Sequence, residues 1–207
     1  MPIPGHIWSP RAKGDVRAAF AERARQDWEG FLRHRAVEMV PGGCLVVIGG
    51  ASDDEGDSGA DALMDLANEV LRDLVSEGTL AEAQYDAMTI PTYNRTPREF
   101  MAPFADGKPF NGLALERQAL KVVPDALWES YRQSGNVDAF AASYVSFFRA
   151  AFGPSLFGAA GSPSGGSGAV GLEAQFADRL AKKIAAEPAR AVTRWRVFAM
   201  LIRKAGG

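Results

Sequence analysis

Cysteine and histidine are nearly absent from this chain. Its 207 residues include one Cys and two His. A single cysteine excludes a disulfide framework and is typical of proteins from a reducing compartment. Neither His6 nor His34 has a Cys, Asp or Glu at ligand spacing, so the sequence predicts no metal site.

Long apolar runs and a strong excess of one charge are also missing. No run approaches the roughly 20 apolar residues of a membrane-spanning helix. The first residues lack the basic and then apolar pattern of a signal peptide. The formal net charge of −2 argues against a general nucleic-acid binder. We therefore expect a cytoplasmic protein that binds neither nucleic acid nor membrane.

Familiar catalytic motifs are missing too. The serines of the glycine-rich segment do not form a G-x-S-x-G elbow. The glycine pairs at 42–43 and 49–50 form neither a dinucleotide-binding motif nor a P-loop. Cys44 lies in an apolar run and is expected to be a small core residue. The residue types alone predict no catalytic residue.

The clearest structural signal is the stretch MVPGGCLVVIGG at 39–50. A Pro-Gly-Gly turn precedes an apolar run rich in β-branched residues. Such a run predicts a strand buried on both faces, as in a parallel sheet, with Val46, Val47 and Ile48 at the centre. Along the chain, the order is helix, strand, helices, strand, helices, strand. This order indicates an α/β fold with about three strands, which is a small sheet for this length and resembles part of a larger one.

Apolar periodicity and turn residues predict the other elements. Helices are expected near 9–39, 63–75, 79–89, 96–104, 125–131, 137–151 and 172–184, and further strands near 113–120 and 194–202. The first helix begins at either Ser9 or Gly14. Two capping boxes are expected, Thr79 with Glu82 and Thr96 with Glu99. The segment 153–171 is rich in Gly and Ser and is expected to form a flexible loop.

The segment GGASDDEGDSGA at 49–60 is acidic and rich in glycine. Its carboxylates could bind a cation. Such a run is more often a solvated loop, and both interpretations stay open.

Three segments, in this order, resemble one family. They are DWEGFLRHRAVEMVPGG at 27–43, LVSEGTLAEAQYDAMTIPTYNRTPREF at 74–100 and RWRVFAMLIRK at 194–204. A helix followed by V-P-G-G and a strand, and then V-S-E-G, a short helix and I-P-x-Y, is similar to the S-adenosylmethionine-dependent carboxyl methyltransferases of the SABATH family. Plant members of that family methylate salicylate, benzoate, jasmonate and related acids.

The resemblance covers only the C-terminal portion of the family. Its members begin with strands that carry an acidic-glycine motif for the cofactor and an H-W-L-S-like stretch for the substrate carboxylate, and neither is found here. The implied fold class is α/β, a partial class I methyltransferase (Rossmann-like) sheet with an α-helical cap. The expected parts are a core helix and central strand at 1–50, the first part of the cap at 51–95, a core helix and strand at 96–123, the second part of the cap at 124–170, and the last core helix and strand at 171–207.

The resemblance also implies a substrate pocket. By position it includes Leu63, Met64, Tyr93 and Phe140, although each could equally be a helix core residue. Met64 stands where the family often has an aromatic residue, which leaves the identity of the acid open. Some members hold magnesium near an Asp-x-Phe-Asn stretch, of which only Asp86 is kept here, so no metal is expected.

The activity implied by the resemblance is methyl transfer from S-adenosylmethionine to the carboxylate of a small aromatic or apolar acid. Because a carboxylate is already ionised at neutral pH, alignment and exclusion of water suffice and no general base is required. Most of the cofactor site is absent from this chain. The resemblance therefore predicts that the chain is inactive alone.

Two hypotheses of different classes stay open. The chain could be the C-terminal portion of an enzyme, derived from a truncated gene model, a split gene or a decayed gene. It would then work with a separate N-terminal half or self-associate through an exposed sheet edge. Alternatively, it could be a non-catalytic module derived from that fold, which binds an apolar ligand or partner. The DNA directly upstream of Met1 would discriminate between these hypotheses.

Overall fold

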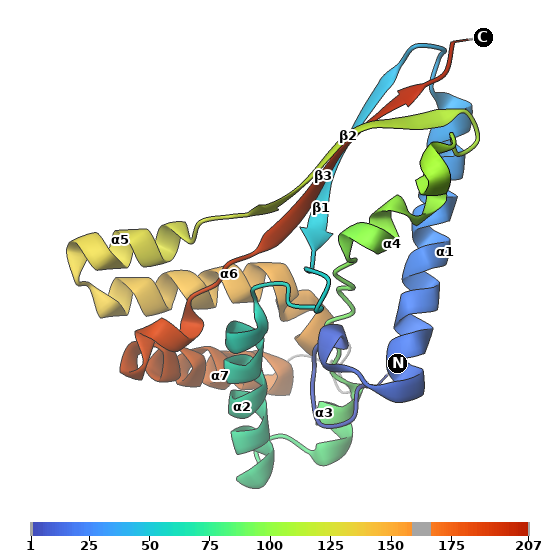
Figure 1. Ribbon diagram of the computed structural model, residues 1–207. Helices are drawn as coiled ribbons and strands as arrows, with labels where there is room; N and C mark the ends of the chain where they lie inside the picture. The colour runs from blue at the N-terminus through green and yellow to red at the C-terminus, as the bar shows by residue number, and fades with distance from the viewer. Residues whose placement is uncertain (1, 159–166, 207) are drawn as a thin grey trace. The chain divides into compact units, whose positions relative to one another are not determined.

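The computed structural model describes residues 2–158 and 167–206. The chain divides into two compact units, each built from three separate stretches (Figure 1). Unit 1 comprises Met1–Arg17, Ala60–Thr92 and Asp125–Thr193, and unit 2 comprises Ala18–Gly59, Tyr93–Pro124 and Arg194–Gly207. Each unit is therefore assembled from distant parts of the sequence.

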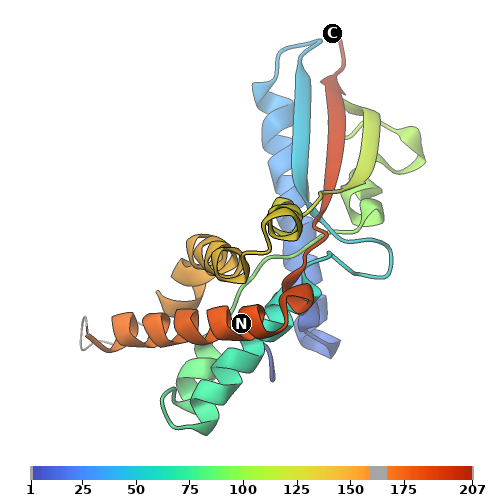
Figure 2. The same cartoon turned by 90° about the vertical axis from the view of Figure 1, so that its left-hand side faces the viewer.

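Unit 2 is built on an antiparallel sheet. Its strands are β1 (Cys44–Ala51), β2 (Leu113–Val122) and β3 (Arg196–Lys204), in the order β1-β3-β2. The last strand of the chain is therefore the central one, and Figure 2 shows the three strands side by side with α1 behind them. The helical elements are α1 (Gly14–Glu38), α4 (Pro97–Met101) and the 3-10 turn η2 (Ala102–Gly107).

One aromatic stack joins this sheet to its helices. The ring of Phe100 lies between Phe198 of β3, at a centroid distance of 5.1 Å, and Trp28 of α1, at 5.5 Å. The indole nitrogen of Trp28 donates a hydrogen bond to the Phe100 carbonyl over 2.9 Å. Burial of such rings is the main stabilising contribution here. The buried members of the cluster are Trp28, Leu32, Ala36, Ala51, Phe100, Phe104, Leu113, Phe198, Met200 and Ile202.

The expectation of a parallel strand buried on both faces is wrong for β1. This strand pairs antiparallel with β3 and lies at the edge of the sheet. Its residues alternate between two faces. Leu45 and Val47 pack against the aromatic cluster, whereas Val46 and Ile48 are 65% and 67% exposed. Cys44 is exposed as well, which corrects its expected place in the core. The apolar run shows that the side chains on both faces of the strand can be buried. It does not show that other elements cover both faces.

Unit 1 is helical. It contains α2 (Asp61–Ser76), α3 (Glu82–Ala87), α5 (Ala126–Ser134), α6 (Val137–Phe157) and α7 (Ser167–Ala186), with 3-10 turns η1 (Ser9–Arg11) and η3 (Pro188–Ala191). Helices α6 and α7 pack through buried Phe148 and Phe176, whose centroids are 5.5 Å apart. In the described part of the chain, no helix is both long and apolar enough to cross a membrane.

Three expectations about element ends can be compared with the structure. The capping box of Thr96 and Glu99 is confirmed, since each side chain accepts a hydrogen bond from the other residue's backbone N–H. Of the two possible starts, α1 begins at Gly14, and Ser9 opens only η1. The segment 153–171 is partly helical, because α6 continues to Phe157 and α7 begins at Ser167, while 159–166 lie outside the described residues.

The capping box expected for Thr79 and Glu82 is wrong. Helix α3 begins at Glu82, and the Ala81 N–H donates to the Gln84 side chain over 3.2 Å. The backbone N–H of Thr79 donates instead to the carbonyl of Leu74, at the end of α2. Thr79 therefore belongs to the C-terminal cap of one helix rather than to the start of the next.

Candidate functional site

The four predicted pocket residues lie in both units. Leu63 and Met64 are on α2 in unit 1 and are 0% exposed. Phe140, on α6 of the same unit, is 3% exposed and stacks on Tyr131 at a centroid distance of 4.9 Å. Tyr93 belongs to unit 2. Each of the three unit 1 residues is part of that unit's core, and their shared role as a substrate pocket stays a prediction.

Tyr93 is half-buried and is held by a hydrogen bond. Its hydroxyl donates to Oε1 of Glu99 over 2.6 Å. The other carboxylate oxygen of Glu99 accepts from the backbone N–H of Thr96 over 2.8 Å, within the capping box of α4. The short helix thus fixes the Glu99 carboxylate, and the carboxylate fixes the phenol ring.

Tyr93 lines a cavity of about 370 Å³ within unit 2. The residues that line it include four alanines, four charged residues and Tyr93. They are Ala18, Ala21, Glu22, Ala24, Arg25, Tyr93, Arg95, Glu99 and Ala102. Small side chains on consecutive turns of α1 leave this space, and the polar residues come from α1 itself and from the segment around α4.

Arg95 is the unusual residue of this cavity. Its Nη2 donates to the backbone carbonyl of Ala24, and its Nε is buried without a hydrogen-bond partner among the described residues. Burial lowers the pKa of Arg95, an effect opposed by the charges of Glu99 and Asp27. An arginine nevertheless stays protonated at neutral pH. Sequence reasoning missed Arg95, because nothing local shows that an arginine two residues after Tyr93 is partly buried.

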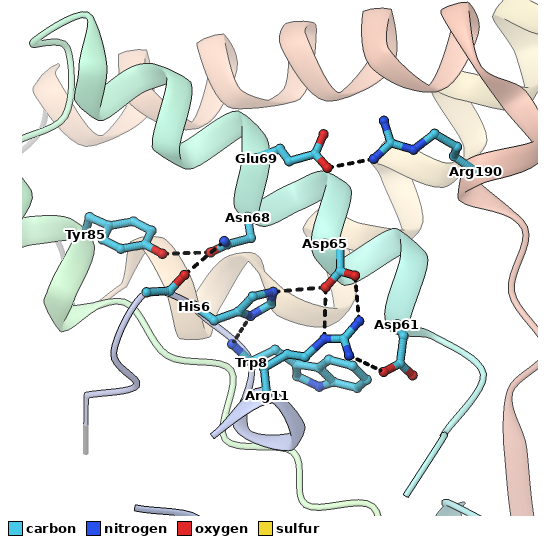
Figure 3. A network of polar contacts seen from close by, with 10 residues as sticks. His6, Trp8, Arg11, Asp61, Asp65, Asn68, Glu69, Tyr85 and Arg190 are labelled. Carbon is cyan, nitrogen blue, oxygen red and sulfur yellow. Dashed lines mark hydrogen bonds and ion pairs between the residues drawn. The ribbon is translucent and has the colours of Figure 1, made fainter. Parts of the chain in front are cut away.

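A second polar cluster fixes residues 5–11 on α2 (Figure 3). The backbone N–H of Trp8 donates to Nδ1 of His6 over 3.1 Å, and Nε2 of His6 lies 3.2 Å from Oδ1 of Asp65. Arg11 pairs with the same carboxylate over 2.6 Å. Because Nδ1 accepts, the neutral tautomer with a proton on Nε2 fits this arrangement. Burial lowers the pKa of His6 more strongly than Asp65 raises it.

We expect the melting temperature to fall as the pH drops from about 7.5 to about 5.5 because His6 resists protonation in the folded state. The His pKa is near 6.5 in the unfolded chain and lower in the folded protein. Below 6.5 the unfolded state therefore binds more protons and stability is lost. His6→Asn should make this pH dependence smaller. The exposed variant His34→Asn is the matched control, and a His6→Asn protein whose melting temperature depends on pH as strongly as that of wild type would contradict the assignment.

The acidic segment at 49–60 binds a positive charge from its own chain. Arg196, whose side chain is 19% exposed, pairs with Asp53 over 2.9 Å and with Asp57 over 2.8 Å. Within 2–158 and 167–206, no group of three or more His, Cys, Asp or Glu side chains could hold a metal ion. Ion pairs with Arg196 therefore hold this segment, so it is not a freely solvated loop.

The glycine pair at the end of β1 is closely packed. A Cβ on Gly50 would lie 3.1 Å from the Asn94 side chain, and one on Gly49 would lie 3.5 Å from the Phe100 ring. This glycine pair is thus packed by side chains of unit 2 itself. The nearby carboxylates that could bind ribose hydroxyls, Asp53 and Asp57, are paired with Arg196.

Comparisons with known proteins agree on one family. The family described as SAM dependent carboxyl methyltransferase matches residues 5–201. The chain is 34% identical over 106 residues to gibberellic acid methyltransferase 2 of Arabidopsis thaliana. This alignment covers 47% of this chain and 27% of that protein. It is 35% identical over 89 residues to salicylate carboxymethyltransferase of Clarkia breweri, and this alignment covers 42% of this chain and 25% of that protein.

A solved structure extends the likeness to the fold. The structure of loganic acid methyltransferase with SAH matches with a TM-score of 0.64 at 16% identity, covering 98% of this chain and 54% of that one. The chain thus spans about half of that structure, and the aligned parts span about a quarter of the two curated relatives. With a family match across residues 5–201, this chain belongs to the SAM-dependent carboxyl methyltransferase (SABATH) family.

Proposed function

We propose that this chain is the substrate-side portion of a carboxyl methyltransferase that uses S-adenosylmethionine and acts on a small aromatic or apolar acid. The observation that carries the proposal is the family match over residues 5–201, together with its coverage of only 54% of a structural relative. In this proposal the chain is inactive without the remaining portion of the fold, because that portion supplies the cofactor site.

The chain's contribution is a shaped apolar wall. Carboxylates are ionised at neutral pH, so methyl transfer to one needs no general base. What the reaction needs is alignment of two charged reactants and exclusion of water. Leu63, Met64, Tyr93 and Phe140 are the residues that we propose for this wall. A mostly apolar lining with few polar groups suits a small acid.

The free edge of β1 supports the need for a further portion of the fold. In the described residues β3 is the only strand that pairs with β1, apart from an isolated parallel bridge between Ala51 and Arg95 at the end of β1, so most of the other edge has no strand partner. Val46 and Ile48 on its outward face are 65% and 67% exposed. Exposed edges and apolar faces of this kind attract another strand. We propose that the cofactor-binding strands of the family fold occupy this edge, whether they belong to a longer or to a separate polypeptide.

A complementation assay tests the proposed function. The chain is mixed or fused with the cofactor-binding portion of a relative, and transfer of a labelled methyl group to benzoate and related acids is measured. We expect a methyl ester only when both portions are present. The double variant Val46→Lys, Ile48→Lys, which changes exposed residues only, should stop the complementation. Ester formation by the chain alone would contradict the proposal, and self-association without complementation would favour the non-catalytic alternative.

A further inference from the structure

We propose that residues 3–12 form a strap that opens from the rest of unit 1 when the solution becomes mildly acidic, with His6 as the sensor. The strap, α2 and the segment 90–92 all belong to unit 1. The inference does not depend on methyl transfer or on a further portion of the fold.

Apolar burial and backbone hydrogen bonds hold the strap closed at neutral pH. Ile3, Ile7 and Trp8 are 4%, 0% and 1% exposed. The Ile90 N–H donates to the Ile7 carbonyl over 2.6 Å, and the Ser9 N–H donates to the Ile90 carbonyl over 3.2 Å. None of these groups titrates, so a pH dependence of the strap must come from its polar contacts with α2.

Both ring nitrogens of His6 have partners that suit the neutral ring. Nδ1 accepts from the backbone N–H of Trp8 over 3.1 Å, and Nε2 lies 3.2 Å from Oδ1 of Asp65 (Figure 3). A protonated imidazole carries a donor on each nitrogen. Protonation would therefore point an N–H group of the ring at the N–H group of Trp8. This backbone group would lose its acceptor inside a residue that is 1% exposed, which is unfavourable.

The carboxylate beside His6 is already compensated by a guanidinium. Arg11 contacts Asp65 through two nitrogens, with Nε 3.0 Å from Oδ1 and Nη2 2.6 Å from Oδ2. Nη1 of Arg11 lies 3.2 Å from Oδ1 of Asp61. Because Arg11 stays protonated, a positive His6 ring would share its counter-charge and gain less than it would from a carboxylate of its own.

The other groups around His6 do not favour a positive ring either. Lys13 adds positive charge, because it lines the same cavity of about 340 Å³ as His6 and Arg11. The Asn68 and Tyr85 side chains are neutral and hydrogen-bond to each other over 2.8 Å. Burial lowers the pKa of His6 in the closed strap, whereas the open strap returns the ring to water and to a pKa near 6.5. The open strap therefore binds more protons below pH 6.5, and acid favours it.

Amide hydrogen exchange followed by NMR tests the opening of the strap. The amides of Trp8, Ser9 and Ile90 report on it, because each donates a hydrogen bond that opening breaks. From about pH 7.0 to about pH 5.5, the opening equilibrium constant, corrected for the intrinsic exchange rates, should rise about threefold or more. The amides of α7, in the same unit, should keep their protection.

His6→Asn separates protonation from loss of the side chain. An asparagine oxygen accepts from the N–H two residues further along the chain, as Nδ1 of His6 does, and it does not titrate in this range. The strap of His6→Asn should therefore open less than about twofold more at the lower pH. The matched control His34→Asn removes the other histidine, which is exposed, and its strap should open as that of wild type does.

The wild-type protein allows a second measurement that needs no variant. A nitrogen NMR titration of the His6 ring should give a pKa below 6.5 and, in the neutral ring, a proton on Nε2. A pKa at or above 6.5, or a neutral ring with its proton on Nδ1, would overturn the proposal. So would a His6→Asn strap that opens with acid as strongly as that of wild type. An equal loss of protection in α7 would also overturn it, because the whole unit would then be unfolding.

Discussion

S-adenosylmethionine is expected to bind the isolated 207-residue chain several orders of magnitude more weakly than it binds a complete relative. The resemblance to the family assigns the cofactor to a glycine turn and an acidic residue on early strands, which the matched segments do not include. The glycine pair after β1 is instead packed by Asn94 and Phe100. Each polar contact that is lost costs roughly 0.5–1.5 kcal/mol, and more when it is charge-assisted. The sum over a charged, polar ligand amounts to several factors of ten.

Isothermal titration calorimetry of the isolated chain with S-adenosylmethionine measures this directly. A complete carboxyl methyltransferase titrated under the same conditions is the positive control. Circular dichroism of the isolated chain shows that weak binding is not caused by unfolding. Micromolar affinity of the isolated chain would show that its own residues form a cofactor site, and the proposed dependence on a further portion of the fold would then be wrong.

Gly59→Ala is expected to destabilise unit 2 by about 3 kcal/mol or more. Gly59 has a φ of +78°, which costs a residue with a side chain about 1–3 kcal/mol. A Cβ there would also lie 1.8 Å from the backbone oxygen of Arg194, so the backbone at the entry to β3 must move. That movement disturbs the 2.7 Å hydrogen bond from the Arg194 N–H to the Gly59 carbonyl. It also disturbs the contacts of Arg196 with the acidic segment.

Gly42→Ala separates the two causes of this loss. Gly42 is also in unit 2 and has a nearly equal φ of +79°, but a Cβ there would meet nothing within 4 Å. This variant should cost only the same backbone strain of about 1–3 kcal/mol, so Gly59→Ala should lose clearly more stability than Gly42→Ala. Urea unfolding followed by tryptophan fluorescence gives both free energies of unfolding. If the two variants lose the same stability, the close approach of Gly59 to Arg194 is not the cause.

Local sequence patterns determined the order and the type of the elements. The periodic apolar residues of α2, the turn before β1 and the capping box of Thr96 and Glu99 all depend on neighbours within a few residues, and all were found. The family was found as well, because its motifs are short and keep their order along the chain. Local physics is enough for these features, because helices, turns and caps satisfy their backbone groups within one segment.

Only the tertiary structure decided which surfaces are covered. Val46 and Ile48 look like core residues in the sequence, yet they are exposed because they lie on the face of β1 opposite the aromatic cluster. Arg95 looks like a surface residue, yet its guanidinium lies against the Ala24 carbonyl of α1. Arg196 meets the acidic segment from more than a hundred residues away. Burial and charge pairing depend on what distant segments place beside a residue, and one stretch of sequence does not contain that information.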